Sequence, residues 1–282
     1  MPVPRKRPAE LPEPTARRHS DFARRVLVAV PAAVLAIVVA DVGGIAWMTL
    51  MAVLGLICLA ELYPLLANWR PVPVVGFVAV IGMTFAAHFG SLEDVVGVAV
   101  AALPLSFLAI LARGQTKEAT LAVASTTLGV MWIGFAFALA VLLRDGPHGN
   151  GVVIDVMLGT FLGDTAAYIG GRLFGRHKLV PTISPKKTVE GLGIGALVAV
   201  LAVVIAGFYQ EAWMAHGTAL LLGFAIAIFG PLGDLFESLI KRDAGAKDAG
   251  SIFGAHGGAL DRLDAAIFTI VVTYYIWTNL PH

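Results

Sequence analysis

Apolar stretches of membrane-spanning length recur along almost the whole chain, and they constrain the fold more than any other feature. A helix needs about 20 mostly apolar residues to cross the hydrocarbon core of a bilayer. Here 58% of the residues are hydrophobic and 14% are charged, whereas a soluble domain carries roughly 25% charged residues. Because lipid cannot satisfy backbone polar groups, such stretches must be helical. The sequence therefore predicts an all-α, polytopic integral membrane protein.

Nine stretches have this length, so we expect about nine transmembrane helices. They cover residues 23–41, 43–66, 72–90, 94–112, 119–143, 152–171, 189–209, 213–236 and 262–280. The connectors are short except for 172–188 and 237–261, two cytoplasmic loops rich in Lys, Arg and Gly.

The same pattern divides the chain into three parts. Residues 1–22 form a basic, Pro-rich cytoplasmic tail that we expect to be disordered. Residues 23–149 form a transmembrane scaffold, and residues 150–282 form a transmembrane domain that holds the candidate catalytic residues. The single cysteine, Cys58, excludes a disulfide within one chain.

The basic residues give an orientation, because cytoplasmic loops of membrane proteins carry an excess of Lys and Arg. With nine spans and a cytoplasmic N-terminus, 19 of the 20 Lys and Arg residues fall on the cytoplasmic side, and Arg144 alone falls outside. Both long connectors then face the cytoplasm, where nucleotides are. The C-terminus is expected on the opposite side.

Polar residues share one helix face at the cytoplasmic end of the eighth span. Asp234, Ser238 and Lys241 are spaced i, i+4 and i+7. An acidic group there is costly, so it is expected to be paired, to bind metal or to line a wet cavity. An Asp234–Lys241 surface pair is the alternative reading.

Two further acids begin the ninth span, next to a glycine-rich loop. Asp261 and Asp264 are three residues apart, and Gly257 and Gly258 precede them. Carboxylates at a helix N-terminus are favoured by the helix dipole, so capping could explain one of them. Two on one face favour an oxygen-ligand cation site, and Mg²⁺ prefers carboxylates together with substrate phosphates. His256 could contact phosphate or cap the turn, and the sequence favours neither.

The connector at 172–188 ends in a compact set of donors and positive charge. Ser184, Lys186 and Lys187 precede a helix expected to start near Thr188. A basic helix start suits a phosphate group, although ordinary cytoplasmic charge would also explain the lysines. Asp164 lies inside the sixth span and is a functional candidate because intramembrane acids are rare.

The first five spans carry few polar residues, and we expect a lipid-facing scaffold there. Glu61, Asp41, His88 and His148 lie at span ends or in outer loops. We expect their side chains to be solvated.

Together these segments resemble a known family. Ser238-Leu-Ile-Lys-Arg, then Lys247-Asp248, then His256-Gly-Gly and Asp261-Arg-Leu-Asp264 are similar in order and spacing to the signature of phosphatidate cytidylyltransferases, also called CDP-diacylglycerol synthases. The segments that begin at Asp164 and at Ser184 also resemble this family. The likeness covers residues 150–264, while the first 150 residues match in character only.

The resemblance implies a metal-dependent nucleotidyltransferase of phospholipid biosynthesis. Such an enzyme transfers CMP from CTP to phosphatidate, giving CDP-diacylglycerol and pyrophosphate. It implies Mg²⁺ and a second cation such as K⁺ as cofactors. It also implies a homodimer, with membrane lipids but no nucleic acid as partners. The implied location is a bacterial inner membrane, with the active site facing the cytoplasm.

The family's functional residues transfer to matching positions here. The implied metal ligands are Asp234, Asp261 and Asp264, and with Lys241 they form the implied catalytic set. The implied nucleotide- and substrate-binding residues are Asp164, Ser184, Lys186, Lys187, Ser238, Arg242, Lys247, Asp248, His256, Gly257, Gly258 and Arg262.

Two alternatives remain open from the residues themselves. In a secondary transporter, Asp164 and Asp234 would bind H⁺ or Na⁺. A transporter predicts broken helices in two corresponding halves, and the sequence has no visible internal repeat. The other alternative is an enzyme that uses CTP on a different lipid.

Overall fold

The computed structural model describes residues 34–210, 212–250 and 257–280, which are almost entirely helical. The chain divides into two compact units, Met1–Val38 and Val39–His282. In the first unit, the described residues 34–38 are helical. The predicted tail at 1–22 lies outside the described residues, and the division of the chain at 149/150 stays a prediction.

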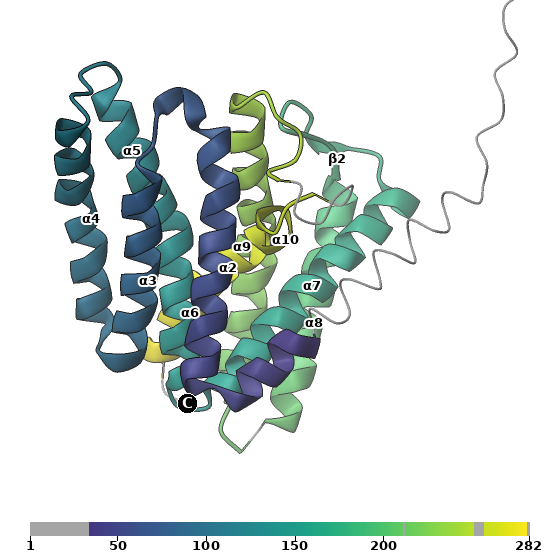
Figure 1. Ribbon diagram of the computed structural model, residues 1–282. Helices are drawn as coiled ribbons and strands as arrows, with labels where there is room; N and C mark the ends of the chain where they lie inside the picture. The colour runs from purple at the N-terminus through teal and green to yellow at the C-terminus, as the bar shows by residue number, and fades with distance from the viewer. Residues whose placement is uncertain (1–33, 211, 251–256, 281–282) are drawn as a thin grey trace, which may run out of the picture. The chain divides into compact units, whose positions relative to one another are not determined.

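The second unit is a bundle of helices with one short β-hairpin (Figure 1). Its elements are α2 (Gly44–Leu65), η1 (Ala67–Trp69), α3 (Pro73–Phe89), α4 (Leu92–Ala112), α5 (Ala119–Gly129), η2 (Val130–Gly134), α6 (Phe135–Asp145), α7 (Gly149–Phe174), β1 (Lys178–Val180), β2 (Ser184–Thr188), α8 (Val189–Tyr209), α9 (His216–Asp243) and α10 (Leu260–Asn279).

Six helical runs in the described part of the chain are long and apolar enough to cross a membrane. They are α2, α4, the run Ala119–Asp145, α7, α8 and α9. Helix α3 is apolar but shorter, with 17 residues. The chain is thus an integral membrane protein by length and composition. The expected nine spans and the cytoplasmic N-terminus stay predictions.

The expected boundaries of both long connectors need correction. The segment 172–188 was expected to be loop, but α7 continues to Phe174, and β1 and β2 then pair antiparallel, with Lys178 opposite Thr188. The segment 237–261 begins later than expected, because α9 continues to Asp243. Basic residues in its last turn favour this extension, since they complement the negative end of the helix dipole.

Helices α7 and α8 lie side by side, and α9 packs against α8 and α10 (Figure 1). Small residues explain the close approach of the first pair. A Cβ atom at Gly195 would lie 2.7 Å from the carbonyl oxygen of Gly163, and one at Gly191 would lie 2.6 Å from that of Ala167. Bare glycine backbone allows this kind of contact between membrane helices. The hairpin that precedes α8 is joined to α9 by contacts of Lys187 with Asp234 and of Arg242 with Ile183.

Candidate active site

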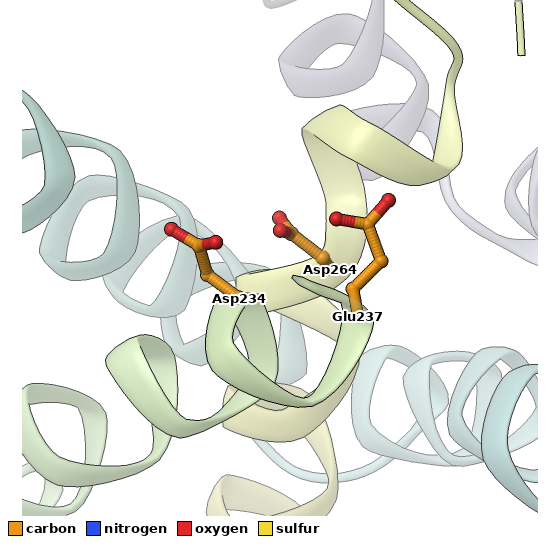
Figure 2. Close-up of side chains that lie close together, drawn as sticks. All are labelled: Asp234, Glu237 and Asp264. Carbon is orange, nitrogen blue, oxygen red and sulfur yellow. The ribbon is translucent and has the colours of Figure 1, made fainter. Parts of the chain in front are cut away.

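Three carboxylates meet where α9 lies against α10 (Figure 2). Asp234 and Glu237 share one face of α9, since they are three residues apart. Asp264 comes from the second turn of α10, and one oxygen atom of each group lies within 4.8 Å of the others. Gly233 permits this approach, because a Cβ atom there would lie 3.1 Å from Cα of Ala265.

Three carboxylates this close together repel one another when no cation lies between them. The residues Glu237 and Asp264 are 1% and 7% exposed, so water screens their mutual repulsion only weakly. The Oε1 atom of Glu237 is buried and has no hydrogen-bond partner in the described part of the chain, although buried polar atoms are nearly always paired. Clustered carboxylate oxygens are the ligands that Mg²⁺ uses in proteins. The residues present therefore fit a divalent cation.

Lys241 joins the cluster to the start of α10. Its Nζ atom donates to Oε2 of Glu237 at 2.5 Å and to Oδ1 of Asp261 at 2.6 Å. The other oxygen of Asp261 accepts the backbone N–H groups of Ala249, at 3.0 Å, and of Gly258, at 2.7 Å. Asp261 thus fixes the connector between α9 and α10 and lies beside the three-carboxylate cluster rather than within it.

A second lysine reaches the cluster from the hairpin. Nζ of Lys187 lies 2.7 Å from Oδ2 of Asp234, and Ser238 donates to Oδ1 of the same carboxylate at 3.3 Å. Successive side chains of a strand point to opposite faces, and Lys186, the neighbour of Lys187 in β2, is exposed. Asp234 is therefore paired with Lys187, and the alternative Asp234–Lys241 surface pair does not form.

Arg242 ties the hairpin to the end of α9. Its Nε atom donates to the backbone oxygen of Ile183 at 3.2 Å, and its guanidinium also donates to the backbone oxygen of Ala246 at 3.3 Å. Ser184 begins β2 directly after this contact. The predicted phosphate-binding segment and the charged end of α9 are thus neighbours in the fold.

The remaining predicted residues lie around this region. Asp164 lines a small hollow between α7, α8 and α9. The side chains of Lys247, Asp248 and Arg262 are exposed. Gly258 is buried beside the loop end. The roles of these residues stay predictions.

Two other predicted residues belong to the glycine-rich segment before α10. Gly257 has a φ of 83°, a left-handed conformation that glycine adopts without strain. His256 lies outside the described residues.

Sequence reasoning missed two buried acids. Glu237 had a usable signal, because it lies one turn after Asp234 and one turn before Lys241 on the same helix. Glu61 was expected to be solvated, and this is wrong: it is 5% exposed, and its Oε2 atom accepts the backbone N–H of Leu260 at 2.8 Å. These two residues are 199 positions apart, so no local pattern could have indicated the contact.

The fold and the site define a class: integral membrane proteins with an acidic, lysine-flanked site at one end of a helical bundle. The chain belongs to the cytidylyltransferase family, whose model matches residues 23–280. It is 32% identical over 255 residues to a phosphatidate cytidylyltransferase of Staphylococcus aureus (strain COL), covering 87% of this chain and 95% of that protein.

Two further relatives carry the same name. The phosphatidate cytidylyltransferase of Staphylococcus epidermidis (strain ATCC 12228) is 31% identical over 249 residues, covering 87% of this chain and 95% of the relative. That of Staphylococcus haemolyticus (strain JCSC1435) is 40% identical over 144 residues, covering 51% of this chain and 54% of the relative. The family expected from the sequence is confirmed.

Proposed function

We propose that this chain is a phosphatidate cytidylyltransferase that makes CDP-diacylglycerol and pyrophosphate from CTP and phosphatidate. One observation carries the proposal: a largely buried cluster of three carboxylates, with Asp234 partly exposed, is bordered by two lysines in a chain of this family. Nucleotide chemistry on phosphates requires both features, because the reacting groups are anions that must be held together.

The reaction needs positioning more than proton transfer. A phosphate oxygen of phosphatidate attacks the α-phosphorus of CTP, a new P–O bond forms, and the bond to the leaving pyrophosphate breaks. The attacking oxygen is already anionic at neutral pH, so no strong general base is required. The main barriers are charge repulsion and alignment of the two substrates. Both barriers are lowered by fixed positive charge.

Lys187 is the side chain best placed to bind a phosphate oxygen of CTP. It lies on a short hairpin and is partly exposed, and its pair with Asp234 joins it to the acidic cluster. On substrate binding, Lys187 would exchange this carboxylate for a phosphate oxygen. Lys241 is more buried and is held by two carboxylates, so its charge orients Glu237 and Asp261. Its predicted contact with the leaving pyrophosphate stays a prediction.

The cluster Asp234, Glu237 and Asp264 would hold Mg²⁺. When bound, Mg²⁺ supplies positive charge that offsets the negative charge of the phosphate oxygens. Asp261 stays a predicted ligand, and a second cation such as K⁺ stays a prediction. Support for metal binding comes from the Oε1 atom of Glu237, which is buried and, among the described residues, has no hydrogen-bond partner.

The topology completes the proposal. We infer nine spans, a cytoplasmic N-terminus, an active site that faces the cytoplasm of a bacterial inner membrane, and a homodimer. The positive-inside distribution of Lys and Arg supports the orientation. A site at the membrane edge lets the acyl chains of phosphatidate stay in lipid while CTP arrives from water.

The test is a transfer assay with purified protein in detergent. The protein is incubated with phosphatidate, Mg²⁺ and CTP labelled in the cytidine, with Asp261→Asn alongside. The proposal predicts label in the lipid phase with the wild type and little with the variant. Unaffected label in the variant would keep the reaction and contradict the role of Asp261. No label from folded protein that binds CTP would indicate another lipid acceptor, and failure to bind CTP would favour the transporter.

A further inference from the structure

We propose that Glu61 is a positioning residue for the active site. Its helix, α2, belongs to the predicted scaffold, and no motif of the family resemblance includes it. Its carboxylate nevertheless lies at the start of α10, the helix that carries Asp261 and Asp264. This inference rests on the proposed cytidylyl transfer and adds a residue that acts through the acidic cluster.

Glu61 is hydrogen-bonded to the first residue of α10. Leu260 is the first residue of this helix, and its N–H is among the groups that have no partner within the helix. Oε2 of Glu61 accepts this N–H at 2.8 Å. Ala259, at the N-cap position, makes no side-chain capping bond. Glu61 therefore supplies from another helix the cap that α10 lacks locally.

Two glycines of the connector between α9 and α10 pack against the carboxylate of Glu61. A Cβ atom at Gly250 or at Gly258 would lie 2.5 Å from the carboxylate carbon of Glu61. Both backbone positions are therefore in direct contact with this group. Gly258 also donates its N–H to Asp261, so Glu61 and Asp261 hold the same loop end from two sides.

Glu61 is also deeply buried, with 5% of its surface exposed. Among the described residues, its Oε1 atom has no hydrogen-bond partner. A carboxylate is an expensive group to place there for packing alone. Its position is explained by what it holds: the first turn of α10 and hence the direction in which Asp261 and Asp264 point. Small displacements of such groups cost about 100-fold in rate in other enzymes.

The experiment compares Glu61→Ala, Glu61→Gln and Tyr63→Phe in the full-length protein. Tyr63 is the matched control: it lies on α2, is 3% exposed and donates to the backbone oxygen of Thr126, away from the connector. Three quantities are measured: kcat and KM for CTP at saturating phosphatidate, and the hydrogen-exchange rate of the Leu260 amide. Circular dichroism and gel filtration establish which variants fold.

Glu61→Ala should lower kcat about tenfold or more, with a smaller change in KM, because alignment in the transition state is lost. It should also speed exchange of the Leu260 amide about fivefold to tenfold, since one hydrogen bond is removed. Glu61→Gln should stay within about threefold of the wild type in kcat, because its amide oxygen can still accept this N–H. Tyr63→Phe should leave kcat and the exchange of Leu260 unchanged.

A folded Glu61→Ala protein with wild-type kcat or with unchanged exchange at Leu260 would overturn the inference. So would a Tyr63→Phe variant that loses kcat as strongly. If Glu61→Ala does not fold, Glu61→Asp decides by the same criteria, because its carboxylate is withdrawn by one methylene. A wild type that exchanges slowly at Leu260 but transfers no cytidylyl group would refute the proposed reaction while leaving the structural contact intact.

Discussion

Removal of Lys241 should expose how strongly the acidic cluster depends on one buried cation. In Lys241→Met, a side chain of similar length replaces the ammonium group that lies 2.5 Å from Glu237 and 2.6 Å from Asp261. The two carboxylate oxygens that it bridges are then at most about 5 Å apart by the geometry of their shared contact. Neither is well solvated, since the side chains of Glu237 and Asp261 are 1% and 12% exposed.

The magnitude follows from the loss of one partner of a buried ion pair, which typically costs about 3–5 kcal/mol of unfolding free energy. Repulsion between two unit charges about 5 Å apart, at an effective dielectric constant of about 20, contributes about 3 kcal/mol of this. Adding Glu237→Gln to Lys241→Met removes that repulsion. The double variant should therefore regain about 2–3 kcal/mol relative to Lys241→Met.

The assay is denaturant unfolding in mixed micelles at neutral pH, without divalent cations. Lys247→Met serves as the control, because Lys247 is an exposed lysine in the connector that follows α9, and surface changes usually stay within about 0.5 kcal/mol. The reasoning is refuted if Lys241→Met is as stable as Lys247→Met. It is also refuted if Glu237→Gln destabilises the Lys241→Met background further.

Two further predictions concern the groups that border the cluster. Lys187→Gln should lower kcat/KM for CTP about 10- to 100-fold, because a hydrogen bond to a charged group contributes about 1.5–3 kcal/mol. Lys186→Gln should lower kcat/KM less. Equal losses of the two variants in steady-state kinetics would contradict the assigned orientation of β2. Gly257→Ala should lose about 1–2 kcal/mol of stability from its left-handed backbone and also lose activity, because the new Cβ atom would lie 2.8 Å from Oδ2 of Asp261. Gly245→Ala is its matched control, with φ of 67° and open space around the added atom, so thermal melting should show similar losses while only Gly257→Ala loses turnover.

Much of the site could be predicted from local spacing. The i, i+4 and i+7 pattern placed Asp234, Ser238 and Lys241 on one helix face, and α9 confirms that they share a helix. The start of α8 near Thr188 is also confirmed, and Thr188 caps this helix by accepting the N–H of Gly191. Such features depend on residues within two helical turns of one another, where the sequence determines geometry directly.

Features that depend on distant segments could not be predicted in the same way. The pairing of Lys187 with Asp234 requires the β-hairpin to lie beside α9, and the polar composition of this connector indicated only a loop. The burial of Glu61 requires α2 to lie beside the first turn of α10. The residues next to Glu61 in the sequence do not indicate which distant segment will bury it.

The fold also explains why the recognised family motifs lie in the second half of the chain. Helices α9 and α10 contribute the three carboxylates and Lys241, and the β-hairpin contributes Lys187. The described part of the first half contributes through a single buried carboxylate on α2 and through packing. Sequence can vary in a helix that faces lipid provided that it stays apolar, whereas charged groups around a phosphate site must keep their geometry.

The central claim is that Asp234, Glu237 and Asp264 form the cation site of cytidylyl transfer. Binding of Mn²⁺ to the purified protein, followed by electron paramagnetic resonance, tests it most directly. The wild type is compared with Glu237→Gln and with the control Glu93→Gln, since Glu93 is an exposed acid in the first turn of α4. The account predicts that Glu237→Gln weakens Mn²⁺ binding about 10- to 100-fold while Glu93→Gln binds as the wild type does. Equal affinity in the wild type and Glu237→Gln would contradict it.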